Sequence, residues 1–291
     1  MKRVPLILAS LLMLYISSCS DDNDDRQIAS EPNLIIKLKF DPTQVRLDNI
    51  GLPATIPVGN AAQSPIFSRM SANYIEFAPT ATTVLGTGEI IYEGDETALG
   101  GDQAIDFQNA IFAGNNETFL TIPLSEVQSG SYEWVRVSLA YQEGTINFRA
   151  DDGNDYTGTL ASFVGYNNYI TSFDLNGSTI EVNANKLQGF WSFEALGFNA
   201  QGQTPEGATT VPNPLFSSSP VPQGSCVVTG EFENEFTITG NETQDITVTL
   251  SFSVNNSFEW TEVIIDGIYE PGAGEQVVDM GLRGLIPTAS N

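Results

Sequence analysis

The chain of 291 residues carries 36 Asp and Glu residues against 11 Lys and Arg residues, and its formal net charge is −25. Such a surface repels nucleic-acid phosphates and anionic lipid headgroups, so we expect no nucleic acid among its partners. Histidine is absent, which excludes Ser-His-Asp and Cys-His catalysis and every zinc or copper site that depends on imidazole.

The first 18 residues are typical of a bacterial signal peptide. Residues 1–3 are a short positive region, and the apolar run 4–16 is shorter than the roughly 20 residues that a membrane-spanning helix needs. The segment ends in Ile16-Ser17-Ser18-Cys19, which resembles the lipobox of bacterial lipoproteins. The resemblance implies cleavage before Cys19, a diacylglyceryl group on its thiol, and acylation of the new amino terminus, with palmitate expected. An unmodified cysteine beside an ordinary signal peptide is the alternative.

Residues 19–32 are predicted to form an acidic, flexible tether. The run 20–25 resembles the export signal of many surface lipoproteins of Bacteroidota. That resemblance implies an outer-membrane location facing the cell exterior, with a periplasmic orientation as the alternative. Lipid on Cys19 leaves Cys226 without a disulfide partner, because the chain has only two cysteines. We therefore expect Cys226 to be a small buried core residue.

Strand patterns dominate the rest of the chain. Apolar and polar residues alternate with a period of two, which indicates half-buried antiparallel strands. The clearest runs are 33–40, 119–124, 132–141 and 245–254. Within 132–141, the side chains predicted to face the core are Val135, Val137, Leu139 and Tyr141.

Turn residues separate these runs and set the expected fold. Asn176-Gly177 is a strong signal for a type I′ hairpin, which needs positive φ at both central residues, and Asp152-Gly153 indicates a second hairpin. With no convincing helical periodicity, the chain is predicted to be all-β, an antiparallel β-sandwich of Greek-key or jelly-roll type. Residues 33–291 are expected to form one elaborated sandwich. The Pro-, Gly- and Ser-rich stretch 199–224 is then a surface loop or a linker, and a domain split near residue 150 or 220 is the alternative.

Calcium is the metal that this acidic, histidine-free chain would favour, because hard cations prefer several oxygen ligands on a turning loop. The first candidate loop offers Asp151, Asp152, Asn154 and Asp155. The second, residues 261–275, resembles a degenerate D-x-N-x-D-G loop with Asp266 at the fifth position and no oxygen ligand at the third. An acidic, solvated hairpin is the simpler interpretation of both loops. Calcium is therefore an optional ligand, and no cofactor is required.

Carbohydrate is the other candidate ligand, since exposed aromatic rings stack on the apolar faces of sugars and neighbouring amides supply hydrogen bonds. The runs 165–173 and 187–198 combine such groups. The candidate binding residues are Tyr166, Tyr169 and Trp191. Core packing is the alternative, and for Trp191 it is the preferred interpretation. No nucleophile elbow, P-loop or dinucleotide motif stands between a strand and a helix, so we expect no enzyme.

Several runs resemble segments of uncharacterised Bacteroidota lipoproteins. The runs are 159–170, 185–191, 246–260 and 274–287. The resemblance covers most of the mature chain and implies no particular activity.

A resemblance of layout links the chain to the MbnP-like proteins, a family associated with copper. Residues 36–41 are similar to the L-x-L-x-F-D strand of that family, and residues 122–124 with 130–132 are similar to its I-P-L … G-x-Y connection. Copper is not expected in this chain, because without histidine a site would depend on Met70, Met280, tryptophans and carboxylates.

These features predict a lipid-anchored protein of the envelope or cell surface that binds a glycan or another extracellular ligand. The alternative is a structural or accessory subunit of an envelope complex without a small-molecule ligand. Such a subunit would carry a broad apolar surface patch. Membrane contact is expected through the N-terminal lipid.

Overall fold

The computed structural model describes residues 31–48, 52–204, 219–222 and 224–291, and the predicted signal peptide and Cys19 lie outside them. The described residues are mainly in strands. Their helical segments are the 3-10 turns η1 (Leu124–Glu126) and η3 (Pro271–Ala273). The prediction of an all-β sandwich is confirmed. No helix in this part of the chain is long and apolar enough to cross a membrane.

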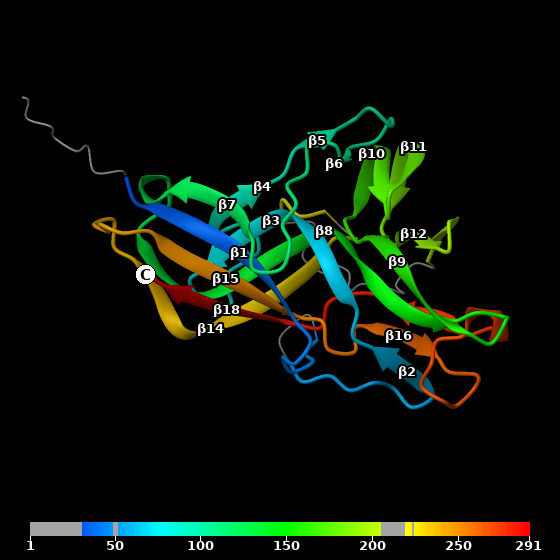
Figure 1. Ribbon diagram of the computed structural model, residues 1–291. Coiled ribbons are helices and arrows are strands. Elements are labelled where there is room, and N and C mark those ends of the chain that lie inside the picture. Colours follow the sequence, from blue (N-terminus) through cyan, green and yellow to red (C-terminus); the bar gives the residue numbers. More distant parts are fainter. Residues whose placement is uncertain (1–30, 49–51, 205–218, 223) are drawn as a thin grey trace, which may run out of the picture. The chain divides into compact units, whose positions relative to one another are not determined.

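Alternation of apolar and polar residues determines the first strand and the sheet around it. In β1 (Asn33–Asp41) every second side chain is buried, as the sequence predicts. β1 lies between β7 (Thr118–Pro123) and β15 (Ile246–Ser253), and β18 (Leu285–Ser290) follows beside β15. Figure 1 shows β1, β15 and β18 side by side. β1 and β15 pair in parallel. The alternation in the sequence predicts which face of each strand is buried, but it does not predict the direction of pairing.

The largest sheet has seven strands. They are β3 (Ile66–Ala78), β4 (Glu89–Glu93), β8 (Gly130–Arg149), β9 (Asp155–Phe163), β12 (Phe190–Ala195), β13 (Phe198–Gln203) and β14 (Cys226–Ile238). β3 pairs along one edge of β8, whereas the other edge pairs with β14 over its first half and with β9 over its second half. β8 therefore belongs to two successive parts of the sheet, each with its own core.

The first half of β8 faces the sheet of β1 and β15 across the main core. Val135, Val137 and Leu139 are buried there, and Tyr141 is buried just beyond them, as predicted. The apolar faces of β1 and β15 pack against these residues, together with Phe77 of β3. This pair of layers is the sandwich that the sequence predicts.

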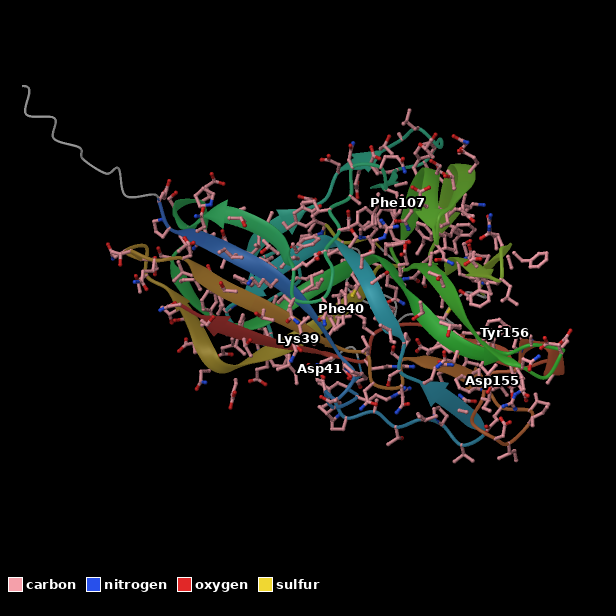
Figure 2. All side chains as sticks on the ribbon, viewed as in Figure 1. Lys39, Phe40, Asp41, Phe107, Asp155 and Tyr156 are labelled. Carbon is pink, nitrogen blue, oxygen red and sulfur yellow. The ribbon has the colours of Figure 1, made fainter. Side chains whose placement is uncertain are left out.

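The second half of β8, with β9 and β12, is covered by a small sheet on each face. One sheet consists of β5 (Glu96–Thr97), β6 (Ala104–Asp106), β10 (Asn167–Leu175) and β11 (Ser178–Leu187), and the other of β2 (Asn60–Gln63), β16 (Phe258–Thr261) and β17 (Gln276–Asp279). Tyr141 and Phe190 pack toward β10 with Phe107, which Figure 2 labels. Ile146 packs on the other face against Trp260 of β16.

Both predicted hairpins are present. Asn176 and Gly177 have φ of 47° and 79° between β10 and β11, and Gly153 has φ of 79° between β8 and β9. Residues Glu31–Asn291 form one unit, in which β8 pairs with strands on both sides of residues 150 and 220. β13 occupies the beginning of the predicted loop or linker 199–224.

Candidate functional site

A cleft of about 530 Å³ opens between the second half of the large sheet and the small sheet that contains β16 and β17. Its volume lies in the usual range for small-ligand pockets, about 300–1,000 Å³. Its aromatic lining residues are Trp191, Phe193, Phe258 and Tyr269. Its polar lining residues are Gln203, Thr204, Glu275 and Gln276. Aromatic walls with a few polar groups at their edge are typical of sites that bind small ligands.

Strand alternation places Trp191 in this cleft. Its neighbour Phe190 is buried with Phe163 in the core toward β10, so Trp191 points to the opposite face of β12. Gly202 of β13 pairs with Trp191, and a Cβ atom at position 202 would overlap the indole ring. The glycine therefore lets the ring lie against the backbone of the neighbouring strand, where the ring remains partly exposed.

The opposite wall of the cleft is a cluster of aromatic rings. Phe258 and Tyr269 line it with ring centroids 5.1 Å apart, and the fully buried Trp260 contacts both rings. Burial, together with the nearby Glu275 carboxylate, raises the pKa of Tyr269 to about 12. The hydroxyl group of Tyr269 is therefore neutral at pH 7 and keeps its hydrogen-bond donor and acceptor functions.

One buried carboxylate shapes the rim of the cleft. Glu275 is 2% exposed and accepts hydrogen bonds from the backbone N–H groups of Val263 (3.0 Å), Ile264 (3.3 Å) and Glu270 (2.7 Å). A carboxylate accepts several such bonds at once, which offsets the cost of removing its charge from water. These bonds connect three positions of the loop between β16 and β17 and so stabilise the wall of the cleft that contains Tyr269.

A recess of about 10 Å³ adjoins the cleft and shares lining residues with it, Ile146 and Met280 among them. Gln142 and Ser162, each 1% exposed, also line the recess. Gln142 Nε2 donates a hydrogen bond to the carbonyl oxygen of Met280. Gln142 Oε1 and Ser162 Oγ have no hydrogen-bond partner within the described residues. They are two of the thirteen buried side-chain atoms that lack a hydrogen-bond partner in the described part of the chain, and both line the recess.

The described lining of the cleft is without a cationic group. Within the ranges that the structure describes, no lysine or arginine lines the cleft or the recess. Each described arginine is in an ion pair with a carboxylate elsewhere. These arginines are Arg46, Arg69, Arg136, Arg149 and Arg283. Among the described lining residues, Glu275 alone carries a carboxylate.

The three predicted carbohydrate-binding aromatic residues do not form one site. Trp191 lines the cleft, whereas Tyr166 and Tyr169 belong to the β10 segment on the other face of the large sheet. The Tyr166 hydroxyl group donates a hydrogen bond of 2.7 Å to Glu96, and burial and this bond raise the pKa of Tyr166 well above its usual value. Tyr169 is partly buried where β10 pairs with Asp106 of β6.

The two predicted calcium loops meet at an arginine. Arg149 at the end of β8 pairs with Asp155 (2.7 Å), Asp266 (2.9 Å) and Glu270 (3.3 Å). Figure 2 labels Asp155 at the start of β9. The guanidinium group therefore supplies one positive charge that these three carboxylates share.

The remaining predicted calcium ligands stabilise the hairpin between β8 and β9. Asp152 accepts hydrogen bonds from the backbone N–H and side-chain amide of Asn154 and from the hydroxyl group of Tyr156, and Asp151 is exposed. Across the described residues, no group of three or more acidic or thiol side chains is arranged to hold a metal ion. Calcium stays a prediction without support from this geometry.

The sulfur-containing residues lie in the core. Cys226 is partly buried against the main core, and burial raises the pKa of its thiol to about 12. It is therefore a protonated side chain at pH 7 that packs against the core, but it is only partly buried, whereas the sequence predicts a buried residue. Met70 belongs to the main core and Met280 to the separate cluster beside the cleft.

Sequence reasoning identified Trp191 and missed the rest of the cleft. Tyr269 and Glu275 lie in the loop whose sequence indicates only calcium, whereas Gln142 follows the apolar run of β8 and Ser162 lies between Ala161 and Phe163 in β9. An interruption of the apolar pattern is the only signal that the sequence offers for the last two residues.

Comparison of the chain with known proteins finds no matching family model, no similar curated protein and no similar solved structure. The function is therefore argued from the cleft residues and the N-terminal sequence.

Proposed function

We propose that this protein is a lipid-anchored binding protein of the bacterial outer membrane that faces the cell exterior and holds a glycan in the cleft at Trp191. The anchor and the location depend on the lipobox-like sequence at Cys19 and the acidic run behind it. The observation that carries the binding function is the position of Trp191, a partly exposed indole in the wall of a cleft of about 530 Å³.

The chemistry of the walls suits a sugar ring. The apolar face of a pyranose stacks on an indole, and Phe193 and Tyr269 add further aromatic surface to the lining of the cleft. Thr204 and Gln276 at the rim carry a hydroxyl and an amide group, which donate to the carbonyl oxygens of Gly189 (3.2 Å) and Gly274 (3.3 Å) and keep their own oxygen atoms as acceptors for sugar hydroxyls. Apolar walls with polar groups at the edge therefore support a glycan as the ligand.

The test is glycan-array screening of the full chain, followed by calorimetric titration with the oligosaccharides that bind. We expect Trp191→Ala to weaken binding by at least about tenfold, because it removes the stacking surface. Phe198→Ala is the matched control, since Phe198 is an exposed aromatic residue on the adjacent strand outside the cleft. Unchanged affinity in Trp191→Ala, or a loss in Tyr166→Ala in its place, would move the site away from the cleft and refute the proposal.

An exposed group of aliphatic side chains favours a second candidate function, that of an accessory subunit in an envelope complex. Val263, Ile264 and Ile265 are exposed in the loop after β16, and Val58 is fully exposed in the turn before β2. The turn and the loop are adjacent, because the backbone N–H of Glu262 donates to the carbonyl oxygen of Gly59 (3.0 Å). Exposed apolar groups of this kind are typical of protein contact surfaces.

Crosslinking on intact cells tests this second function. A partner that is recovered with the wild-type protein should be lost with the double variant Ile264→Ser, Ile265→Ser. Leu187→Ser is the control, because Leu187 is equally exposed but belongs to β11. A strictly monomeric protein without any crosslinked partner would exclude the accessory role and leave the glycan proposal intact.

A further inference from the structure

The geometry points to an uncharged glycan as the ligand, with one of its hydroxyl groups bound in the recess between Gln142 and Ser162. This inference rests on the proposed binding function. The two parts of this inference come from different observations. The lack of charge follows from the electrostatics of the cleft, and the hydroxyl group follows from the unpartnered atoms of the recess.

An anionic sugar would find no counter-charge in the cleft. Within the described ranges no lysine or arginine lines it, and the Glu275 carboxylate is part of its wall. The backbone N–H of Arg149 donates a hydrogen bond of 2.8 Å to the carbonyl oxygen of Tyr269, but the Arg149 guanidinium group pairs with three carboxylates. The whole chain has a formal charge of −25, which adds long-range repulsion. A uronic acid or a sulfated sugar would therefore lose its hydration without gaining an ion pair.

The recess selects a single hydroxyl group by size and by chemistry. Its volume of about 10 Å³ admits a group of roughly the size of one water molecule. Gln142 Oε1 can accept a hydrogen bond, and Ser162 Oγ can both donate and accept one. A sugar hydroxyl group is also a donor and an acceptor, so it satisfies both buried atoms at once. A carboxylate or sulfate group is too large for this volume and has no proton to give to Gln142 Oε1.

The alternation of strands gives the recess its access to the cleft. Ser162 pairs with Trp191 across β9 and β12, and Gln142 pairs with Ser162 across β8 and β9. The three side chains therefore lie in one row on the face that lines the cleft. The inferred pose directs the hydroxyl-bearing edge of a pyranose stacked on Trp191 along this row toward Ser162 and Gln142.

Calorimetric titration of the full chain with cellohexaose, maltohexaose, mannohexaose and hexagalacturonate tests the preference for uncharged ligands. At least one neutral hexasaccharide should bind at least about tenfold more tightly than hexagalacturonate. Gln276→Lys should narrow that difference, because it places a cation at the rim. Gln201→Lys is the matched control, since its exposed side chain leaves β13 on the face opposite to the cleft while the net charge changes equally.

Ser162→Ala tests the seat of the hydroxyl group, with an expected loss of roughly 3- to 10-fold in affinity for the neutral ligand. Ser192→Ala is its control, because Ser192 is a buried serine on the other face of β12. Unchanged affinity in Ser162→Ala would overturn the role of the recess. Equal binding of hexagalacturonate and the neutral sugars, or equal effects of both lysine variants, would overturn the charge argument. Both results would leave the proposed function standing, whereas no Trp191-dependent binding of any sugar would refute the proposed function itself.

Discussion

Replacement of Glu275 by alanine removes the acceptor of three backbone hydrogen bonds and tests how the rim of the cleft is held. A hydrogen bond to a charged group contributes roughly 1.5–3 kcal/mol when it is buried and less when solvent reaches the donor. The bond from Glu270 is buried, whereas those from Val263 and Ile264 are only partly buried. About 2 kcal/mol for the first and about 0.5–1 kcal/mol for each of the others gives about 3–4 kcal/mol.

Removal of the buried charge from the native state returns about 1 kcal/mol of desolvation, so the expected decrease in the free energy of unfolding is about 2–3 kcal/mol. At roughly 2–4 °C per kcal/mol for a chain of this size, Tm should fall by about 4–12 °C. The stability of Glu275→Gln should lie between those of Glu275→Ala and the wild type. Its amide oxygen still accepts either the two bonds from Val263 and Ile264 or the single bond from Glu270, while its NH2 group opposes the remaining N–H.

Urea denaturation and hydrogen exchange measure this effect. Amide protection should fall first at Val263, Ile264 and Glu270, since these groups lose their acceptor. Gln276→Ala is the control, because the neighbouring side chain is exposed and should change stability by less than about 0.5 kcal/mol. Equal stabilities of Glu275→Ala and Gln276→Ala, or unchanged protection at the three amides, would show that the carboxylate does not hold this loop.

Three further predictions concern the body of the fold. Burial raises the pKa values of Tyr132 and Tyr269 to about 12. The stability that their neutral hydroxyl groups contribute is therefore complete below pH 10 and is lost between pH 10 and 12. Ultraviolet titration should show tyrosinate from these residues only as the protein unfolds, and their ionisation near pH 10 in the folded protein would contradict this. Phe77→Ala should cost about 3–5 kcal/mol in urea denaturation, because the ring is fully buried and contacts three aromatic rings at 5.6–6.0 Å, whereas Phe198→Ala should be nearly neutral. Gly177→Ala should lower the free energy of unfolding by about 1 kcal/mol in urea denaturation, because alanine is strained at a φ of 79°. No atom lies within 4 Å of the added Cβ, so a larger loss of stability would contradict this explanation.

Local patterns predicted the strands because their physical cause is local. The alternation in 33–40 and 132–141 sets which side chains are buried whatever the neighbouring strand is, and β1 and β8 bury the expected residues. Asn176-Gly177 determines its own turn through positive φ, and the turn is present. Strand direction and neighbour are not local properties. The alternation could therefore not predict the parallel pairing of β1 with β15, nor that the long β8 belongs to two cores.

The sequence by itself determined that the chain is β-rich and acidic and lacks histidine, and it predicted Trp191 as a candidate ligand residue with core packing as the preferred interpretation. Only the tertiary structure decided that Trp191 faces a cleft while Tyr166 and Tyr169 lie beyond the opposite face of the sheet. It also decided that the acidic loops surround Arg149, because the packing of β16 against β8 brings residues 149 and 266 together. The physical reason is the same in each case: a side chain's face follows from its own strand, whereas its partners depend on which distant strands the core brings together.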